Sequence, residues 1–250
     1  MDGYGFVIPV YRHGRKCFEL VRKILHYEMP VIVVDDGNGD EDRAWLEKAG
    51  NLSPLVDIVT LPENGGKGHA MYAGFERADE MKLSHVMQID ADGQQDSSRI
   101  PSFREKSEKY PDTAVIGYPV YDESVPAGRK HGRVFGNFFS HLSALDFKSV
   151  RDYMCGFRVY PVEATLRAIR KKHLDLRMGF DLEILIRMQF SGIPMTSLPV
   201  GMTYPVDGYS NFHLFRDNVR ISFVFVRMLP MTLFHIRALL ETRRASRERA

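Results

Sequence analysis

The sequence has few cysteines and no long apolar run. Only two of its 250 residues are cysteine, Cys17 and Cys155. Two are too few for a disulfide framework, so we expect reduced, buried thiols of a cytosolic protein. The first apolar segment, Phe6–Val10, is too short for a signal peptide. The best candidate for a membrane span, residues 221–240, is interrupted by charged residues and a proline. These absences predict a cytoplasmic protein.

A strong net charge is also absent, because the formal net charge is +2 at pH 7. So small a balance argues neither for nor against a polyanionic partner, and nucleic acid is not among the partners that we expect. The charge is nevertheless uneven. From Arg216 to the end, eight arginines stand against three acidic residues. A basic end on a slightly acidic body indicates an anionic surface as the partner of that segment.

Apolar runs that fit strands alternate with segments of helical spacing in the first half, at residues 4–11, 30–34, 56–61 and 85–89. This alternation predicts an α/β fold with a mostly parallel sheet and helices on both faces. The second half is less regular, and its expected strands are 113–118, 152–160 and 193–200. No linker or repeat divides the chain, so we expect one catalytic body over residues 1–212 and a helical extension over residues 213–250.

A cluster of carboxylates follows the apolar run at 85–89. Asp90, Asp92 and Gln94 alternate, so a locally extended chain would point all three side chains to one side. Oxygen ligands at this spacing suit a hard divalent cation, Mg²⁺ or Mn²⁺, better than Zn²⁺. An acidic turn after a strand is the alternative, because a lone Asp-x-Asp is a weak motif.

Two more polar segments stand at the ends of expected strands. Asp35 and Asp36 could accept hydrogen bonds from a nucleobase or ribose, or could cap a helix and form a turn with Gly37. The segment 65–68 could bring backbone N–H groups and Lys67 close to a phosphate, or could be a tight strand-to-helix turn. Ligands of parallel sheets bind beyond the carboxyl ends of the strands, so this convergence predicts a binding site.

Basic residues of two kinds occur in the second half. Arg129, Lys130 and Arg133 form a compact patch, which is typical of a solvated helix end. Arg158 differs, because it stands between two apolar residues of an expected strand. A charged side chain in that position needs a partner or a cleft.

The C-terminal segment 214–240 reads as one or two helices with a bend at Pro230. Arg216, Arg220 and Arg227 fall within a narrow arc of such a helix and form a basic stripe. A basic amphipathic helix can lie in a membrane interface, which would make the protein peripheral on the cytoplasmic face. The alternative is a helix that packs on the catalytic body or on a second subunit of a homo-oligomer.

Four segments come in the order and spacing of glycosyltransferase family 2: Val31–Gly37, Asn64–Ala70, Gln88–Gln94 and Asp152–Arg158. The chain resembles this family over about residues 4–212, and its short members similar to dolichyl-phosphate mannose synthase most. The resemblance implies a GT-A fold, a divalent cation and a UDP- or GDP-sugar donor. It further implies inverting transfer to a lipid-linked phosphate or to a glycan or glycolipid hydroxyl.

The resemblance also implies roles for residues of the site. Those that would contact the donor are Pro9, Tyr11, Asp35, Asp36, Lys67, Asp90 and Ser210. The metal would be held by Asp90, Asp92 and Gln94. The acceptor phosphate would meet Arg129 and Lys130. The catalytic residues would be Asp92, Asp152 and Arg158, with Asp152 as general base if the acceptor is a hydroxyl.

The sequence departs from the family pattern in two places. The segment Gly117–Val120 lacks an arginine that often follows that strand, and no arginine precedes the late motif around Ser210. The absence of a Gln-x-x-Arg-Trp signature argues against a processive polysaccharide synthase. A nucleotide-sugar-binding or scaffolding protein that has lost turnover is the alternative, but intact Asp90, Asp92 and Asp152 favour an active enzyme.

Overall fold

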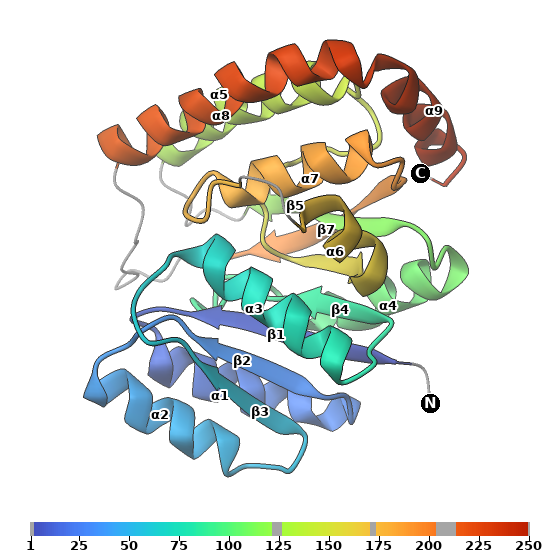
Figure 1. The fold of residues 1–250 in the computed structure, drawn as a ribbon. Coiled ribbons are helices and arrows are strands. Elements are labelled where there is room, and N and C mark those ends of the chain that lie inside the picture. The colour runs from blue at the N-terminus through green and yellow to red at the C-terminus, as the bar shows by residue number, and fades with distance from the viewer. Residues whose placement is uncertain (1–2, 122–126, 171–173, 204–213, 250) are drawn as a thin grey trace.

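The computed structural model describes residues 3–121, 127–170, 174–203 and 214–249 (Figure 1). For residues 127–132, 135 and 214–219 it describes the backbone alone. The strands are β1 (Tyr4–Val10), β2 (Val31–Asp35), β3 (Val56–Thr60), β4 (His85–Gln88), β5 (Ala114–Tyr121), β6 (Arg158–Pro161) and β7 (Met195–Met202). The α-helices are α1 (Gly14–Ile24), α2 (Asp40–Gly50), α3 (Lys67–Glu80), α4 (Ile100–Lys109), α5 (Ala127–Ala144), α6 (Val162–Ile169), α7 (Phe180–Phe190), α8 (Leu214–Phe234) and α9 (Ile236–Arg247).

The strands form one sheet in the order β3-β2-β1-β4-β6-β5-β7. Strands β3, β2, β1 and β4 are parallel neighbours, and so are β5 and β7. Strand β6 runs antiparallel to β4 and β5. The mostly parallel sheet predicted from the sequence is therefore confirmed, with one antiparallel strand between its two parallel parts.

Alternate residues of the central strands enter two separate cores. In β1, Phe6 and Ile8 belong to the core under α1, α2 and α4, whereas Val7 belongs to the core under α3, α6 and α7. In β2, Val33 and Val34 divide in the same way. Because both faces of β1 and β2 are covered by helices, apolar residues are favoured on both faces, and these two strands read as nearly continuous apolar runs.

Helices α5 and α8 lie side by side as a further layer, outside α7 (Figure 1). Val224, Phe225 and Met228 of α8 are buried in the core that also contains α7, and Leu239 of α9 joins them. The predicted extension at 213–250 thus contributes to the same core as the catalytic body.

The C-terminal segment forms two helices, one of the two readings that the sequence allowed, but the break between them does not lie at Pro230. Helix α8 continues through Pro230, and the chain turns by 92° at His235, between α8 and α9. A proline removes one backbone donor from a helix, and tertiary contacts can offset that loss. Here Phe225 contacts Phe139 of α5, and Thr232 donates a hydrogen bond to Ser143 O.

By length and composition, none of the described helices could cross a membrane alone, while the bent pair 220–234 and 236–247 meets that criterion when taken together.

Candidate active site

The carboxyl ends of β1 and β2 are joined through Asn38. Its side chain donates to Val10 O at 2.9 Å and to Asp35 Oδ1 at 2.7 Å, and its Oδ1 accepts from Arg12 N. Asp35 is fully buried and accepts a second bond from Asn38 N. The two residues implied as donor contacts at the end of β1, Pro9 and Tyr11, are both half-buried beside this junction.

Asp36 holds the glycine segment in place. Its two carboxylate oxygens accept bonds from Asn64 Nδ2, Gly65 N and Gly66 N at 2.7–3.0 Å. Burial raises the pKa of Asp36, and the two glycine N–H bonds lower it in part. At Gly66 φ is +97°, a left-handed conformation that glycine adopts without strain.

The first N–H groups of α3 are used inside the protein as well. Gly68 N and His69 N both donate to Leu176 O, at 2.9 and 3.3 Å. With Gly65 N and Gly66 N on Asp36, these backbone donors form a tight strand-to-helix turn, which is the alternative that the sequence left open. Any phosphate contact of this segment would therefore depend on Lys67.

Lys67 bridges two carboxylates. Its Nζ lies 2.8 Å from Asp90 Oδ1 and 2.8 Å from Asp181 Oδ2. Burial alone would lower the pKa of Lys67, but the charges of Asp181 and Asp90 outweigh burial and raise the pKa. The ammonium group is therefore held beside the first carboxylate of the Asp-x-Asp motif.

Asp90 and Asp92 are close enough to repel one another. Burial raises the pKa of Asp92, and the charge of Asp90 raises it further. Gln94 is buried beside them, and its backbone N–H donates to Asp92 Oδ1 at 3.0 Å. Two carboxylates and an amide form an oxygen set that suits Mg²⁺ or Mn²⁺.

The described residues contain no group of three or more His, Cys, Asp or Glu that could hold a metal ion. Mg²⁺ is commonly held by only one or two carboxylates together with substrate phosphates, so the Asp90–Asp92 pair fits a cation shared with a phosphate ligand.

Gly156 brings the segment 152–158 against the Asp-x-Asp motif. A Cβ built at Gly156 would come within 2.5 Å of Asp90 Oδ1 and Oδ2. Only glycine leaves room for the carboxylate, so the sheet places residues 66 positions apart in direct contact. The strand predicted over 152–160 is confirmed only at its end, because β6 begins at Arg158.

Asp152 is saturated with hydrogen bonds. Arg133 donates to it through Nε at 2.5 Å and Nη2 at 2.8 Å, and Asn137 Nδ2 donates at 2.9 Å. The backbone N–H groups of Met154 and Cys155 also donate to Oδ1. A carboxylate has about four lone-pair positions, and Asp152 receives five donors. Burial alone would raise the pKa of Asp152, but Arg133 outweighs burial and lowers it.

The prediction that Arg133 is a solvated residue at a helix end is wrong. Its side chain is 18% exposed and pairs with Asp152. The sequence could not show this, because the two residues are 19 positions apart and belong to different elements.

The expectation that Arg158 needs a partner is confirmed. Its guanidinium is fully buried and donates to Cys155 O, Tyr153 O and Tyr160 Oη at 2.6–2.9 Å. It also lies 3.5 Å from Asp181 Oδ1. Arg158 therefore fixes the backbone of the segment that carries Asp152.

Sequence reasoning missed Asp181, which connects Lys67 with Arg158. Asp181 is the second residue of α7, and it reads as an ordinary acidic residue near a helix start. A signal was present, because α7 is buried along its whole length and is apolar apart from Asp181, Glu183, Arg187 and Gln189. Charged residues in such a helix require partners.

Three predicted site residues fall outside what the structure describes. Arg129 and Lys130 belong to the backbone of α5, but their side chains lie outside the described residues. Ser210 lies outside them entirely. Their roles at the acceptor and the donor stay predictions.

The sequence matches the family model "Glycosyl transferase family 2" over residues 6–167. It is 32% identical over 225 residues to the human dolichyl-phosphate beta-glucosyltransferase, covering 79% of this chain and 66% of that protein. It is 32% identical over 162 residues to an undecaprenyl-phosphate 4-deoxy-4-formamido-L-arabinose transferase of Pseudomonas fluorescens, covering 62% and 45%. The chain thus spans just under two thirds of the length of the dolichyl-phosphate relative.

Solved structures share the fold at low identity. Glucosyl-3-phosphoglycerate synthase from Mycobacterium tuberculosis superposes with a TM-score of 0.67 at 15% identity, covering 92% of this chain and 80% of that chain. A Pyrobaculum calidifontis mannosyltransferase in complex with GDP-Man and Mn²⁺ gives 0.60 at 16% identity, covering 98% and 73%. The GT-A fold expected from the sequence is thereby confirmed.

Proposed function

The chain belongs to glycosyltransferase family 2, and on that basis we propose that it transfers a sugar from a nucleotide-sugar donor to a polyprenyl phosphate. The human relative is named for dolichyl-phosphate and the Pseudomonas fluorescens relative for undecaprenyl-phosphate. These names support a lipid phosphate as the acceptor class. The donor would be a UDP- or GDP-sugar.

The saturated state of Asp152 is the observation that carries the choice of acceptor. A sugar hydroxyl needs a general base, and the candidate base has its lone pairs occupied and its pKa lowered. A lipid phosphate monoester is largely ionised at neutral pH, with a second pKa of about 6. It can attack without a base, so this site suits a phosphate acceptor better than a hydroxyl.

The donor diphosphate would lie at the Asp90–Asp92 edge of the sheet. A divalent cation held there by Asp90, Asp92 and Gln94 would neutralise charge on the departing nucleoside diphosphate. Lys67, already paired with Asp90, adds a positive charge at the start of α3. Transfer would proceed by a single displacement with inversion at the sugar carbon.

Arg133, Asp152 and Arg158 have a positioning role in this proposal. Arg158 fixes the turn at 153–157, and Asp152 fixes Arg133 and Asn137 of α5. Helix α5 also carries Arg129 and Lys130, the predicted contacts of the acceptor phosphate. Asp152 thereby sets the position of the helix that would meet the acceptor.

A peripheral position on the cytoplasmic face of a membrane accords with this acceptor. Exposed apolar side chains lie along three neighbouring helices: Val134, Phe138 and Leu142 of α5, Phe223, Val226, Leu233 and Phe234 of α8, and Ile236 and Leu240 of α9. A lipid interface would cover such a surface, and a homo-oligomer is the competing occupant.

The test is transfer of radiolabelled sugar from a panel of UDP- and GDP-sugars, with Mg²⁺, Mn²⁺ or EDTA present. Each donor is offered a polyprenyl phosphate and the matching polyprenol, which differ only in the phosphate. We expect metal-dependent product with the phosphate and none with the alcohol. Equal transfer to the alcohol would reject the phosphate acceptor, and no transfer with any donor would favour a protein that has lost turnover.

A further inference from the structure

A cavity lined in part by arginines lies beside the candidate active site, under α8. The cavity, of about 680 Å³, is lined by residues of the glycine segment, of the segment before α7 and of α8: Gly65, Leu174, Asp175, Leu176, Arg177, Arg220, Phe223, Val224, Val226 and Arg227. None of Asp90, Asp92, Asp152 and Arg158 contributes to its lining. It is therefore separate from the groups proposed to perform the transfer.

The cavity carries an excess of positive charge. Arg177, Arg220 and Arg227 stand in its lining against one carboxylate, Asp175. The guanidinium of Arg177 donates to the neutral Asn64, through Nη1 to Oδ1 at 3.1 Å and through Nη2 to the backbone oxygen at 3.4 Å, while its backbone N–H donates to Asp175 Oδ1. Arg220 forms no ion pair with any carboxylate that the structure describes. Such an excess favours an anion with several acceptor oxygens.

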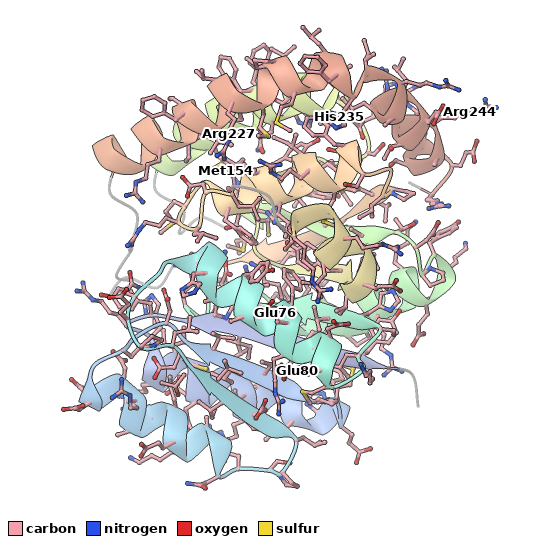
Figure 2. All side chains as sticks on the ribbon, in the orientation of Figure 1. Glu76, Glu80, Met154, Arg227, His235 and Arg244 are labelled. Carbon is pink, nitrogen blue, oxygen red and sulfur yellow. The ribbon has the colours of Figure 1, made fainter. Side chains whose placement is uncertain are left out.

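Arg227 has a donor to spare. It pairs with Glu183 of α7, but Glu183 also pairs with Arg187 at 2.6 Å, so one carboxylate serves two guanidinium groups. The Nε of Arg227 is buried and has no hydrogen-bond partner among the described residues. Figure 2 labels Arg227 between α8 and α7, on the inner side of α8. The sequence placed Arg227 on a basic stripe with Arg216 and Arg220, and the structure pairs its guanidinium with Glu183 of α7.

The outer wall of the cavity is apolar and open to solvent. Phe223 and Val226 line it and are nevertheless 69% and 67% exposed. Around the axis of α8, Arg220 and Arg227 lie between the exposed pair Phe223 and Val226 on one side and the buried Val224 on the other. This follows from the helical repeat, which brings residues three, four and seven positions apart to the same side. Exposed apolar residues continue along α8 to Leu233 and Phe234.

A cationic pocket that opens onto an apolar helix face matches a phosphate carried on an apolar chain. We propose that the cavity between α8 and the segment 174–177 binds the phosphate headgroup of a lipid, with its chain along Phe223 and Val226. A free phosphate would use the arginines but not the apolar wall. This inference does not depend on sugar transfer.

The test is calorimetric titration of the whole chain, in EDTA and without nucleotide sugar, so that no transfer takes place. The probes are farnesyl phosphate and dioctanoyl phosphatidylglycerol below their critical micelle concentrations. Farnesol and inorganic phosphate are the controls for the chain and the charge. We expect at least one lipid phosphate to bind roughly tenfold tighter than either control, because farnesol lacks the charge-assisted hydrogen bonds to arginine and inorganic phosphate lacks the apolar contact.

Variants locate the site. Arg220→Gln is expected to weaken lipid-phosphate binding about tenfold. Phe223→Ser is expected to weaken lipid-phosphate binding while leaving inorganic phosphate unchanged. The matched control is Arg237→Gln on α9, whose side chain is 92% exposed, and it should bind as the unaltered protein does. Both Arg220 and Phe223 are accessible enough for the variants to fold, which thermal melting checks.

The two probes separate the sources of the phosphate. Binding of farnesyl phosphate alone identifies a prenyl phosphate, binding of phosphatidylglycerol alone identifies a bilayer phospholipid, and binding of both identifies a general lipid-phosphate site. Each supports the proposal if Arg220→Gln weakens it. The proposal is overturned if Arg220→Gln binds like the unaltered protein, or if no lipid phosphate binds more tightly than inorganic phosphate.

Discussion

Lys67 and Asp181 form an ion pair at 2.8 Å that joins the glycine segment to α7. Asp181 also lies 3.5 Å from the buried guanidinium of Arg158, and Lys67 reaches Asp90. Two cations and two carboxylates thus form one connected network between β4, β6, α3 and α7. The network holds the Asp-x-Asp motif and the segment 152–158 in a fixed relationship.

Replacing Asp181 should therefore reduce stability as well as turnover. Asp181→Asn leaves Lys67 and Arg158 without a shared counter-charge in a buried setting, which costs about 3–5 kcal/mol. Urea denaturation measures this loss. The control is Asp57→Asn, which breaks a half-exposed pair with Arg77 and should cost less than about 1 kcal/mol. Equal losses in the two variants would contradict the network.

Asp92→Asn should abolish metal-dependent turnover and leave the fold intact. The asparagine side chain can still accept the bond from Gln94 N, but it lacks the charge that a divalent cation requires. We expect kcat/KM to fall by at least about 100-fold, which corresponds to roughly 2.7 kcal/mol. Asp40→Asn, a change at a fully exposed side chain, is the control. Full activity in Asp92→Asn would refute the assignment of Asp92 as a metal ligand.

Arg133→Ala should destabilise the protein, because it leaves the buried carboxylate of Asp152 without its cation. A loss of about 3–5 kcal/mol is expected near neutral pH. Arg167→Ala removes an exposed pair with Glu163 and should cost less than about 1 kcal/mol. Denaturation of both variants checks the difference, and a loss for Arg133→Ala no larger than that for Arg167→Ala would show that the buried pair adds nothing.

The loss caused by Arg133→Ala should depend on pH. Burial alone would raise the pKa of Asp152, but Arg133 outweighs burial, so the folded-state pKa is lowered. A lowered carboxyl pKa stabilises the fold above the unfolded value of about 3.9, and that contribution is lost as the pH falls through the folded pKa. The stability gap between the unaltered protein and Arg133→Ala should therefore be widest near neutral pH and narrow as the pH falls toward the lowered folded-state pKa of Asp152. If the difference in unfolding free energy between the two proteins widens in acid, the stabilising role of the Arg133–Asp152 ion pair is contradicted.

Leu233→Ser with Phe234→Ser should weaken sedimentation with anionic liposomes. These side chains are 72% and 87% exposed, so their replacement removes apolar contact with lipid and leaves the core intact. Raised salt should weaken binding too, since headgroup attraction is screened over roughly 8–10 Å at physiological ionic strength. Leu52→Ser, at an exposed leucine after α2, is the control. If the unaltered protein stays in the supernatant at low salt, the membrane contact is rejected.

Deleting the C-terminal helices would be a poorer test of the same idea. Val224 and Met228 of α8 lie in the core under α3, α6 and α7, so a chain ending near residue 212 would lose packing as well as any lipid contact. The sequence offered packing and membrane contact as alternatives for this segment. The structure confirms packing for one side of α8 and leaves the other side exposed.

The sequence by itself determined the sheet and the edge at which the site lies. A continuous apolar run such as residues 31–34 fits a strand whose two faces are both covered by helices. Because the strands that carry Asp35 and Asp90 at their carboxyl ends are parallel, these residues lie at the same edge of the sheet. The need of Arg158 for hydrogen-bond partners also follows from its sequence neighbours alone, because burying an unpaired charge among apolar residues is costly in any fold.

Only the tertiary structure decided which partner each charge received. Arg133 forms an ion pair with Asp152, 19 positions away in the sequence, and Lys67 forms one with Asp181, more than a hundred positions away. Asp90 packs against Gly156. It also decided that α8 passes through Pro230 and turns at His235. Periodicity and composition describe a chain's neighbours in sequence, whereas these pairings depend on how β4, β6 and α7 meet in space.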